Sequence, residues 1–304
     1  MKKSIKIISS LIQFNPSNSL RWILIALALL FLSLFLFIPL IAVFNNAFSE
    51  GIRIFRQAIT DSGTLAAIRL TVLIVSIALP LNIIFGISAA WAITKFQFSG
   101  KNILITLIDL PLTVSPVISG TIFILIFGSQ SLLGAWLIGH DLKIVFAVPG
   151  IVLATIFVTF PYIARELIPL MQTFGNDDEE TALSLGASGW QTFWRITLPN
   201  IKWGLIYGVI LSTARAIGEF GAVSVVSGHI RGKTITVPLQ VEILYNEYNF
   251  VAAFAVASLL VLVSLLTIGL KKFAEWKKQR LVIVNENYLY QNEEVVSGYS
   301  NSEC

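Results

Sequence analysis

Six long apolar stretches constrain the fold of this 304-residue chain more than any other feature. They cover residues 22–44, 70–93, 103–127, 144–162, 203–226 and 250–270. At a rise of about 1.5 Å per residue, helices of this length reach roughly 30 Å, the thickness of the hydrocarbon core of a bilayer. The sequence therefore predicts an all-α integral membrane protein with six transmembrane helices.

A soluble protein with six buried helices is the alternative, but its helices would need polar faces that these stretches lack. Composition also favours the membrane, because 56% of the residues are hydrophobic and only 12% are charged. The charged share of a soluble domain is about 25%. The mean hydropathy of +0.81 points the same way.

Basic residues are divided unequally between the two sides of the predicted membrane. Fourteen lie before the first stretch, between the second and third, between the fourth and fifth, or after the last, and six lie in the other connections. Cytoplasmic loops of membrane proteins are rich in lysine and arginine. This asymmetry predicts that both termini and the loop 176–199 are cytoplasmic. The net charge of +4 then reflects topology and gives no support to a nucleic-acid partner.

The chain lacks the constellations typical of enzymes and metal sites. Its one cysteine is Cys304, and His140 and His229 stand alone in predicted external loops. Nucleophilic catalysis needs a paired base, and a zinc site needs several clustered ligands. Residues 228–234 nearly spell a phosphate-binding loop but have one residue too few between the glycines. We expect no catalytic residue, no metal and no cofactor.

The polar run 176–199 between the fourth and fifth stretches begins with signals for a short helix. Asn176 is a good N-cap, and Glu179 follows at the capping-box spacing. Four consecutive acidic residues, 177–180, fill the first turn, where the helix dipole favours carboxylates. Gly186 is the expected terminator because glycine adopts positive φ without steric cost.

A second short helix follows in the same run. Ser188 and Gln191 repeat the capping-box spacing, and Pro199 is expected to end the helix. One helical face would carry Trp190, Phe193, Trp194 and Thr197. Such a hairpin could lie on the lipid surface. The acidic residues argue against this because the cytoplasmic leaflet is anionic, so a protein groove is the better partner.

The same run resembles a known motif. Glu180, Thr181 and Ala182, then Gly186 after three residues, and Ile196, Leu198 and Pro199 after nine more match the pattern E-A-A-x3-G-x9-I-x-L-P. This pattern is similar to the loop of bacterial ABC importer permeases, the binding-protein-dependent transport system inner membrane components. Thr181 departs from the first alanine. The resemblance implies the type I ABC importer permease fold, with a coupling helix that docks into a separate cytoplasmic ATPase. It also implies a polar contact from Glu180 and a turn at Gly186.

Residues 214–232 and 238–245 resemble the W-type permease subunits of sulfate/thiosulfate importers more than their T-type partners. The resemblance implies a subunit, not an enzyme, that forms half of a pathway for sulfate and thiosulfate in a bacterial inner membrane. Its implied partners are a T-type permease, two copies of the ATPase and an external sulfate-binding protein. A molybdate or tungstate permease would share this architecture. A secondary anion transporter would need inverted repeats, and none is visible.

Arg215 and Glu219 are opposite charges four residues apart in the fifth stretch. A charge at the bilayer centre costs about 2.5–3.5 kcal/mol, so such residues usually face the protein interior or an aqueous cavity. The pair is either a self-neutralising structural pair or part of the anion pathway. Asp109, near Pro111, has the same two interpretations, and the structural one is favoured.

The resemblance covers roughly residues 66–270 and divides the chain into three parts. Residues 1–65 would form an N-terminal segment with the first transmembrane helix and an external loop. Residues 66–270 would form the permease domain, and residues 271–304 a polar, flexible cytoplasmic tail.

Overall fold

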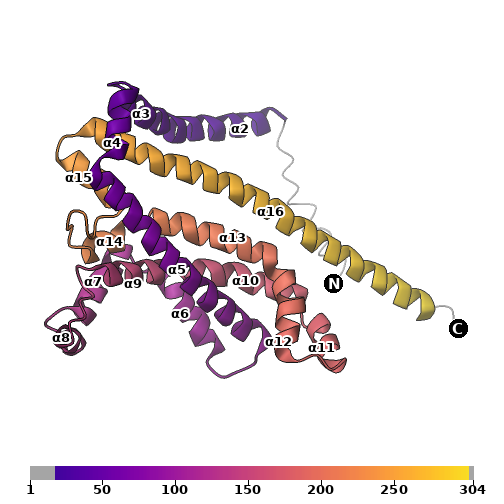
Figure 1. Ribbon diagram of the computed structural model, residues 1–304. Helices are drawn as coiled ribbons and strands as arrows, with labels where there is room; N and C mark the ends of the chain where they lie inside the picture. Colours follow the sequence, from indigo (N-terminus) through magenta and orange to yellow (C-terminus); the bar gives the residue numbers. More distant parts are fainter. Residues whose placement is uncertain (1–17, 301–304) are drawn as a thin grey trace.

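A computed structural model describes residues 18–300 of the chain, and side chains between residues 20 and 276 (Figure 1). All regular elements in this part are helical. The elements are α2 (Asn18–Leu32), η1 (Ser33–Phe37), α3 (Ile38–Ala47), α4 (Ile52–Thr60), α5 (Ser62–Lys95), α6 (Lys101–Thr113), α7 (Pro116–Phe127), α8 (Leu132–Gly139), α9 (Val148–Thr159), α10 (Pro161–Phe174), α11 (Asp177–Ser184), α12 (Gly189–Thr192), η2 (Phe193–Thr197), α13 (Leu198–Ile217), α14 (Gly221–Val226), α15 (Val237–Asn246) and α16 (Phe250–Ser300). Both η elements are π-helical.

Four helical segments in the described part are long and apolar enough to cross a membrane: Leu20–Ala47, Ser62–Lys95, Val148–Phe174 and Phe250–Trp276. The bent pair α6 and α7 would make a fifth. The expected all-α membrane architecture is confirmed, but the count of six spans is not. The two remaining predicted spans, 103–127 and 203–226, are both interrupted.

The first interruption lies between α6 and α7, whose axes differ by 108°. Pro116 disfavours helical geometry in the residue before it, and Ser115 accordingly has ψ of 132°. The second interruption follows α13, which ends at Ile217 before the separate helix α14 begins at Gly221. The predicted spans therefore contain bends that apolar length alone does not reveal.

The fourth span is longer than expected. Helix α10 continues to Phe174, and Gly175, with φ of 66°, ends it. Arg165, which the apolar pattern assigns to the cytoplasmic loop, therefore lies within this helix. Its Nε atom is 3.3 Å from Oδ1 of Asp109 on α6. The pair joins α6 to α10, which is consistent with a structural role for Asp109, but neither side chain is buried.

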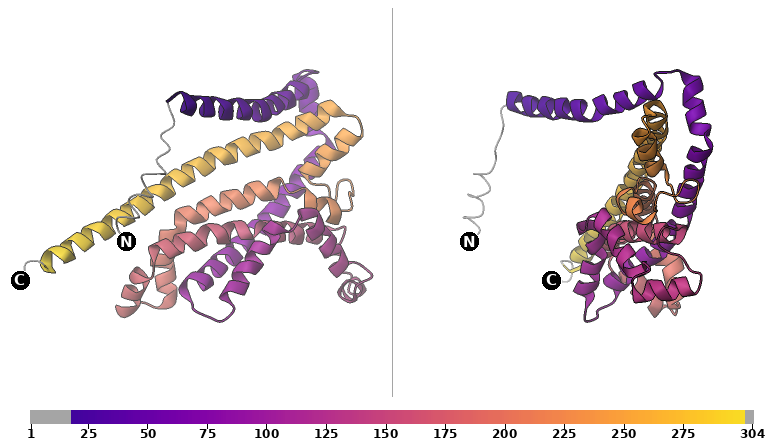
Figure 2. Two further views of the ribbon diagram at one scale, coloured as in Figure 1. Left: turned by 180° about the vertical axis from the view of Figure 1, so that it is seen from behind. Right: turned by 90° about the vertical axis from the view of Figure 1, so that its left-hand side faces the viewer.

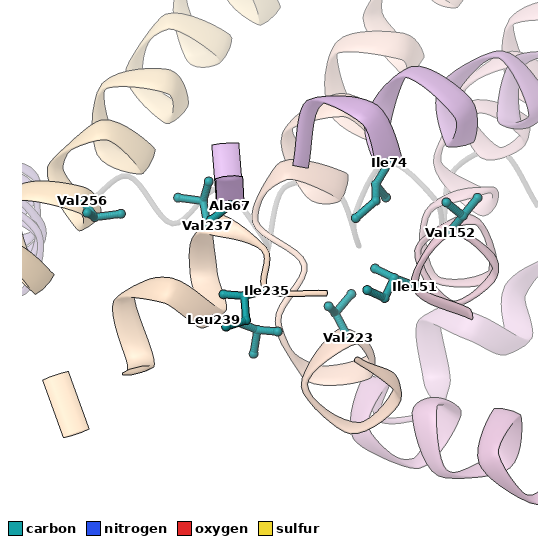
Figure 3. Packing of buried hydrophobic residues seen from close by; sticks show 9 residues of the cluster. All are labelled: Ala67, Ile74, Ile151, Val152, Val223, Ile235, Val237, Leu239 and Val256. Atoms are coloured by element: carbon teal, nitrogen blue, oxygen red, sulfur yellow. The ribbon is translucent and has the colours of Figure 1, made fainter. Parts of the chain in front are cut away.

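A core of aliphatic side chains joins α5, α9, α14, α15 and α16 (Figure 3). Its nine buried residues are Ala67, Ile74, Ile151, Val152, Val223, Ile235, Val237, Leu239 and Val256. Close helix approach supports the neighbouring packing, because a Cβ atom on Gly120 of α7 would lie 2.7 Å from the Ala222 carbonyl oxygen of α14. Glycine is thus required at this crossing. The two interrupted segments therefore pack closely against each other.

Two groups of short helices lie at opposite ends of the molecule (Figures 1 and 2). Helices α11 and α12 lie together at one end, and α8, α14 and α15 lie toward the other. Helix α2 stands apart from this body, and none of the apolar window in its span is buried. In a bilayer, this surface is available to lipid or to another membrane subunit.

The structure describes part of the predicted C-terminal tail. Helix α16 runs without a break from Phe250 to Ser300, so residues 271–300 of that tail are helical. Cys304 and the basic residues at the N-terminus lie outside the described residues. The helices α3 and α4 pack against α16, which links the N-terminal segment to the last predicted span.

Candidate coupling loop and intramembrane ion pair

The second of the two predicted loop helices begins as expected. Ser188 caps α12: its side chain accepts a hydrogen bond from the Gln191 N–H, and Gln191 Oε1 accepts one from the Ser188 N–H at 2.9 Å. Gly186 separates α11 from α12 and has φ of 88°. The helix–turn–helix and its left-handed glycine are confirmed.

The first capping box is wrong. The Asn176 side chain makes no capping hydrogen bond to α11. The side chains of Asn176 and Glu179 instead contact Lys95, at the end of α5. The Lys95 Nζ donates a hydrogen bond to Asn176 Oδ1 at 3.0 Å and forms an ion pair with Glu179 Oε2 at 2.8 Å. A charge-assisted contact to the ammonium is stronger than the neutral cap that it replaces.

Lys95 is the residue of this site that the sequence analysis did not single out. Its Nζ also donates to the Gly175 carbonyl oxygen, 80 positions away along the chain. The only signal in the sequence was a lysine in the same predicted cytoplasmic layer as an acidic run. That signal does not say which lysine pairs with the acidic run, because several other lysines lie on the same predicted side of the membrane.

The aromatic face of the second helix divides in two. Phe193 and Thr197 are buried, and the Phe193 ring lies 5.2 Å from that of Trp91 on α5. Trp190 is 67% exposed, and Trp194 is also exposed. The single predicted stripe thus supplies both an anchor to α5 and an outward surface.

Leucines extend the outward surface onto the first helix. Leu183 is exposed, and Leu185 is 85% exposed next to the Gly186 turn. Together with Trp190 and Trp194 they form what we call the exposed apolar face. Large apolar side chains that a polar loop leaves exposed are typical of a protein interaction site.

Pro199 does not end the second helix. The chain passes from α12 through the π-helical turn η2 into α13, with Pro199 in the first turn of α13. In the first turn of a helix the backbone N–H has no partner within the helix, so the missing N–H of proline costs little there. The π-helical turn before Pro199 changes the hydrogen-bond pattern at this point. The coupling loop is therefore continuous with the fifth predicted span.

The motif residues fall into two groups on this frame. Glu180, Thr181 and Ala182 lie on α11, where the first two are exposed and Ala182 is partly buried. Ile196 and Leu198 are partly buried at the junction of η2 and α13, and Pro199 is exposed. The first part of the motif thus lies on the short helix α11, and the last part lies at the start of the long helix α13.

The second candidate site is the pair Arg215 and Glu219. Arg215 Nη1 lies 2.5 Å from Glu219 Oε2, and the Glu219 side chain is only 1% exposed. Glu219 Oε1 accepts a hydrogen bond from the Ala222 N–H at 2.9 Å, in the first turn of α14. Arg215 remains partly exposed. The pair therefore holds the break between α13 and α14 and presents one cation to its surroundings.

A cavity of about 990 Å³ opens at the end of the molecule remote from the coupling loop. Its lining includes Lys143 and Lys233, three polar residues at 129–131, and no carboxylate side chain. Phe146 contributes to its wall in a left-handed conformation, with its N–H bonded to the Val226 carbonyl oxygen at 3.0 Å. The only charged side chains in this lining are the two lysines, so the lining favours an anion over a cation.

Comparisons with known proteins agree with this geometry. Residues 82–278 match the model of the binding-protein-dependent transport system inner membrane component family. The chain is 50% identical over 263 residues to the sulfate transport system permease protein CysW of Escherichia coli (strain K12), covering 86% of this chain and 90% of that protein. It is 34% identical over 239 residues to CysT, the sulfate transport system permease protein of the same strain, covering 79% and 86%.

A solved structure supports the fold. The chain resembles a subunit of the bacterial alginate ABC transporter in complex with an alginate pentasaccharide-bound periplasmic protein, with a TM-score of 0.71. The match covers 87% of this chain and 96% of that chain at 17% identity, so it bears on the fold alone. With its multi-pass helical body and the matched region from 82 to 278, the chain belongs to the binding-protein-dependent transport system inner membrane component family.

Proposed function

We propose that this chain is the membrane-spanning permease subunit of an ATP-driven importer for sulfate and thiosulfate. The exposed apolar face beside the family motif carries the importer assignment, because a separate ATPase would cover it. The substrate assignment rests on the 50% identity to a named sulfate permease protein over most of both chains. Two lysines without a carboxylate in the external cavity are consistent with an anionic cargo.

The proposed assembly adds partners in three roles. A T-type permease completes the pathway, which is supported by the existence of both W-type and T-type relatives in one strain. Two copies of a cytoplasmic ATPase bind the coupling loops. A sulfate-binding protein delivers the anion from outside. ATP-driven closure of the ATPase pair moves the loop 176–199 and switches the pathway from inward to outward facing.

Substrate uptake tests the proposed cargo against molybdate and tungstate, the alternative cargo of this architecture. In cells whose only sulfate importer contains this chain, excess thiosulfate should suppress uptake of radiolabelled sulfate, whereas molybdate at the same concentration should not. Removing the ATPase subunit should abolish uptake, which separates this importer from a secondary transporter. Suppression by molybdate but not by thiosulfate would contradict the proposed cargo.

The proposed orientation places both termini and the coupling loop in the cytoplasm of a bacterial cell. A membrane-impermeant thiol reagent should label His229→Cys in intact cells, because His229 lies in the connection between α14 and α15 on the proposed external side. Cys304 is the internal control and should react only after lysis. Labelling of Cys304 in intact cells would contradict this orientation.

A further inference from the structure

We propose that Lys95 is a positioning residue that transmits movement of the coupling loop to helix α5. The inference rests on the proposed function and extends it to a residue outside the family motif. It is drawn from one group of contacts, the Lys95 node, which consists of Lys95, Gly175, Asn176, Glu179 and Thr197. These residues come from four segments that meet at the end of α5.

The ammonium of Lys95 is saturated by acceptors from the start of the loop. It donates to the Gly175 carbonyl oxygen at 2.5 Å and to Asn176 Oδ1 at 3.0 Å, and it pairs with Glu179 Oε2 at 2.8 Å. A lysine has three N–H donors, so three oxygens at these distances satisfy all of them. Three residues at the start of the loop are thereby held at the end of α5.

The ion pair at the centre of the node is largely shielded from water, although Gly175 and Asn176 are exposed. The Lys95 side chain is 9% exposed and that of Glu179 is 16% exposed. Surface ion pairs contribute little, but a shielded pair becomes costly when one partner is removed, because the other charge is left without compensation. Separating Lys95 from Glu179 is therefore unfavourable, so the two side chains should move together when the loop is displaced.

Within the node, Glu179 also contacts the turn that leads into the fifth predicted span. Its Oε1 accepts a hydrogen bond from the Thr197 hydroxyl at 2.6 Å, and Thr197 is buried in η2 at the base of α13. One carboxylate thus links α11, α5 and the start of α13. The contact between Trp91 and Phe193 lies beside it and joins α5 to η2 a second time.

The coupling loop consequently has two functional faces. Leu183, Leu185, Trp190 and Trp194 are exposed for a partner, while the Lys95 node ties the inner side of the loop to α5. Helix α5 packs in turn on α9, α10 and α13. A displacement of the exposed face therefore reaches the membrane body through the node, and Lys95 is its contact on α5.

The test uses the whole importer in liposomes: this chain, its permease partner, the ATPase and the binding protein. Lys95→Met keeps the length of the side chain and removes its charge and donors. Its matched control is Lys101→Met, since Lys101 starts α6 on the same side and shows no ion pair within the described side chains. Lys95→Arg tests rescue by a conservative cation. ATP hydrolysis is measured with and without sulfate-loaded binding protein, together with sulfate uptake.

Lys95→Met should retain the ATPase subunit and its basal hydrolysis but lose stimulation by about tenfold, with a matching loss of uptake. Lys95→Arg should recover most of both, and Lys101→Met should behave as wild type. Wild-type stimulation in Lys95→Met would overturn the proposal. Loss of the ATPase or of assembly would also overturn it, because the node would then build the docking surface or the fold. A wild-type importer that fails to move sulfate would contradict the proposed function instead.

Discussion

Glu180→Ala and Gly186→Val should each abolish sulfate uptake while leaving the chain in the membrane at near-normal abundance. Glu180 is exposed on α11, so its loss removes the proposed contact to the ATPase and little internal packing. Gly186 has φ of 88°, and a Cβ atom added there would have no neighbouring atom within 4 Å. Valine would fit the space but would strain the backbone by about 1–2 kcal/mol, which redirects α12 relative to α11.

Two substitutions in the same loop provide matched controls. Gly189 also has open space around its Cβ position but lies in the first turn of α12 without a positive φ, so Gly189→Val adds the same side chain without that strain. Asp177→Ala removes another carboxylate from the first turn of α11. Uptake, abundance and co-purification of the ATPase should be measured for all four variants. Normal transport by both Glu180→Ala and Gly186→Val would refute the coupling role of the loop.

Arg215→Gln should damage the assembled importer more than Glu219→Gln. It would leave the nearly inaccessible Glu219 carboxylate without a countercharge, at a cost of about 3–5 kcal/mol for a buried pair. Glu219→Gln keeps an oxygen that can accept the hydrogen bond from the Ala222 N–H. The cation it leaves on Arg215 is partly exposed. The amount of intact complex extracted from membranes measures this difference.

The double substitution separates packing from anion handling. Arg215→Gln with Glu219→Gln removes both charges, so the amount of complex should recover. We propose that Arg215 also attracts the dianion and that Glu219 limits how tightly it binds, so sulfate uptake per assembled complex should stay impaired. Full recovery of uptake in the double variant would exclude a direct role of either charge and leave a purely structural pair.

Short-range signals in the sequence correctly predicted the features that depend on neighbouring residues alone. The Ser188 capping box and the left-handed Gly186 both depend on residues within one helical turn, and both are present. The cap at Asn176 had the same spacing, but it failed because Lys95 offers a charged partner from 81 positions away. Pro199 was misjudged as a helix end because the π-helical turn before it cannot be recognised from residue types alone.

The division of the aromatic face shows the same limit. A helical period places Trp190, Phe193, Trp194 and Thr197 together, but it cannot say which of them meets α5. The bend at Ser115 lay within reach of the sequence, since Pro116 disfavours a helical residue before it. Apolar length concealed that bend, and it also concealed the separation of α14 from α13.

The sequence by itself determined the membrane class, the helical architecture and the family, because apolar length, helix caps and a spaced motif are properties of contiguous residues. Tertiary structure alone decided the ion pairs of Lys95 with Glu179 and of Asp109 with Arg165, and the burial that divides the coupling loop into an anchored and an exposed face. The physical reason is that a charge selects its partner by distance, and an aromatic ring by distance and by exclusion of water. Both depend on how helices far apart in the chain pack against one another.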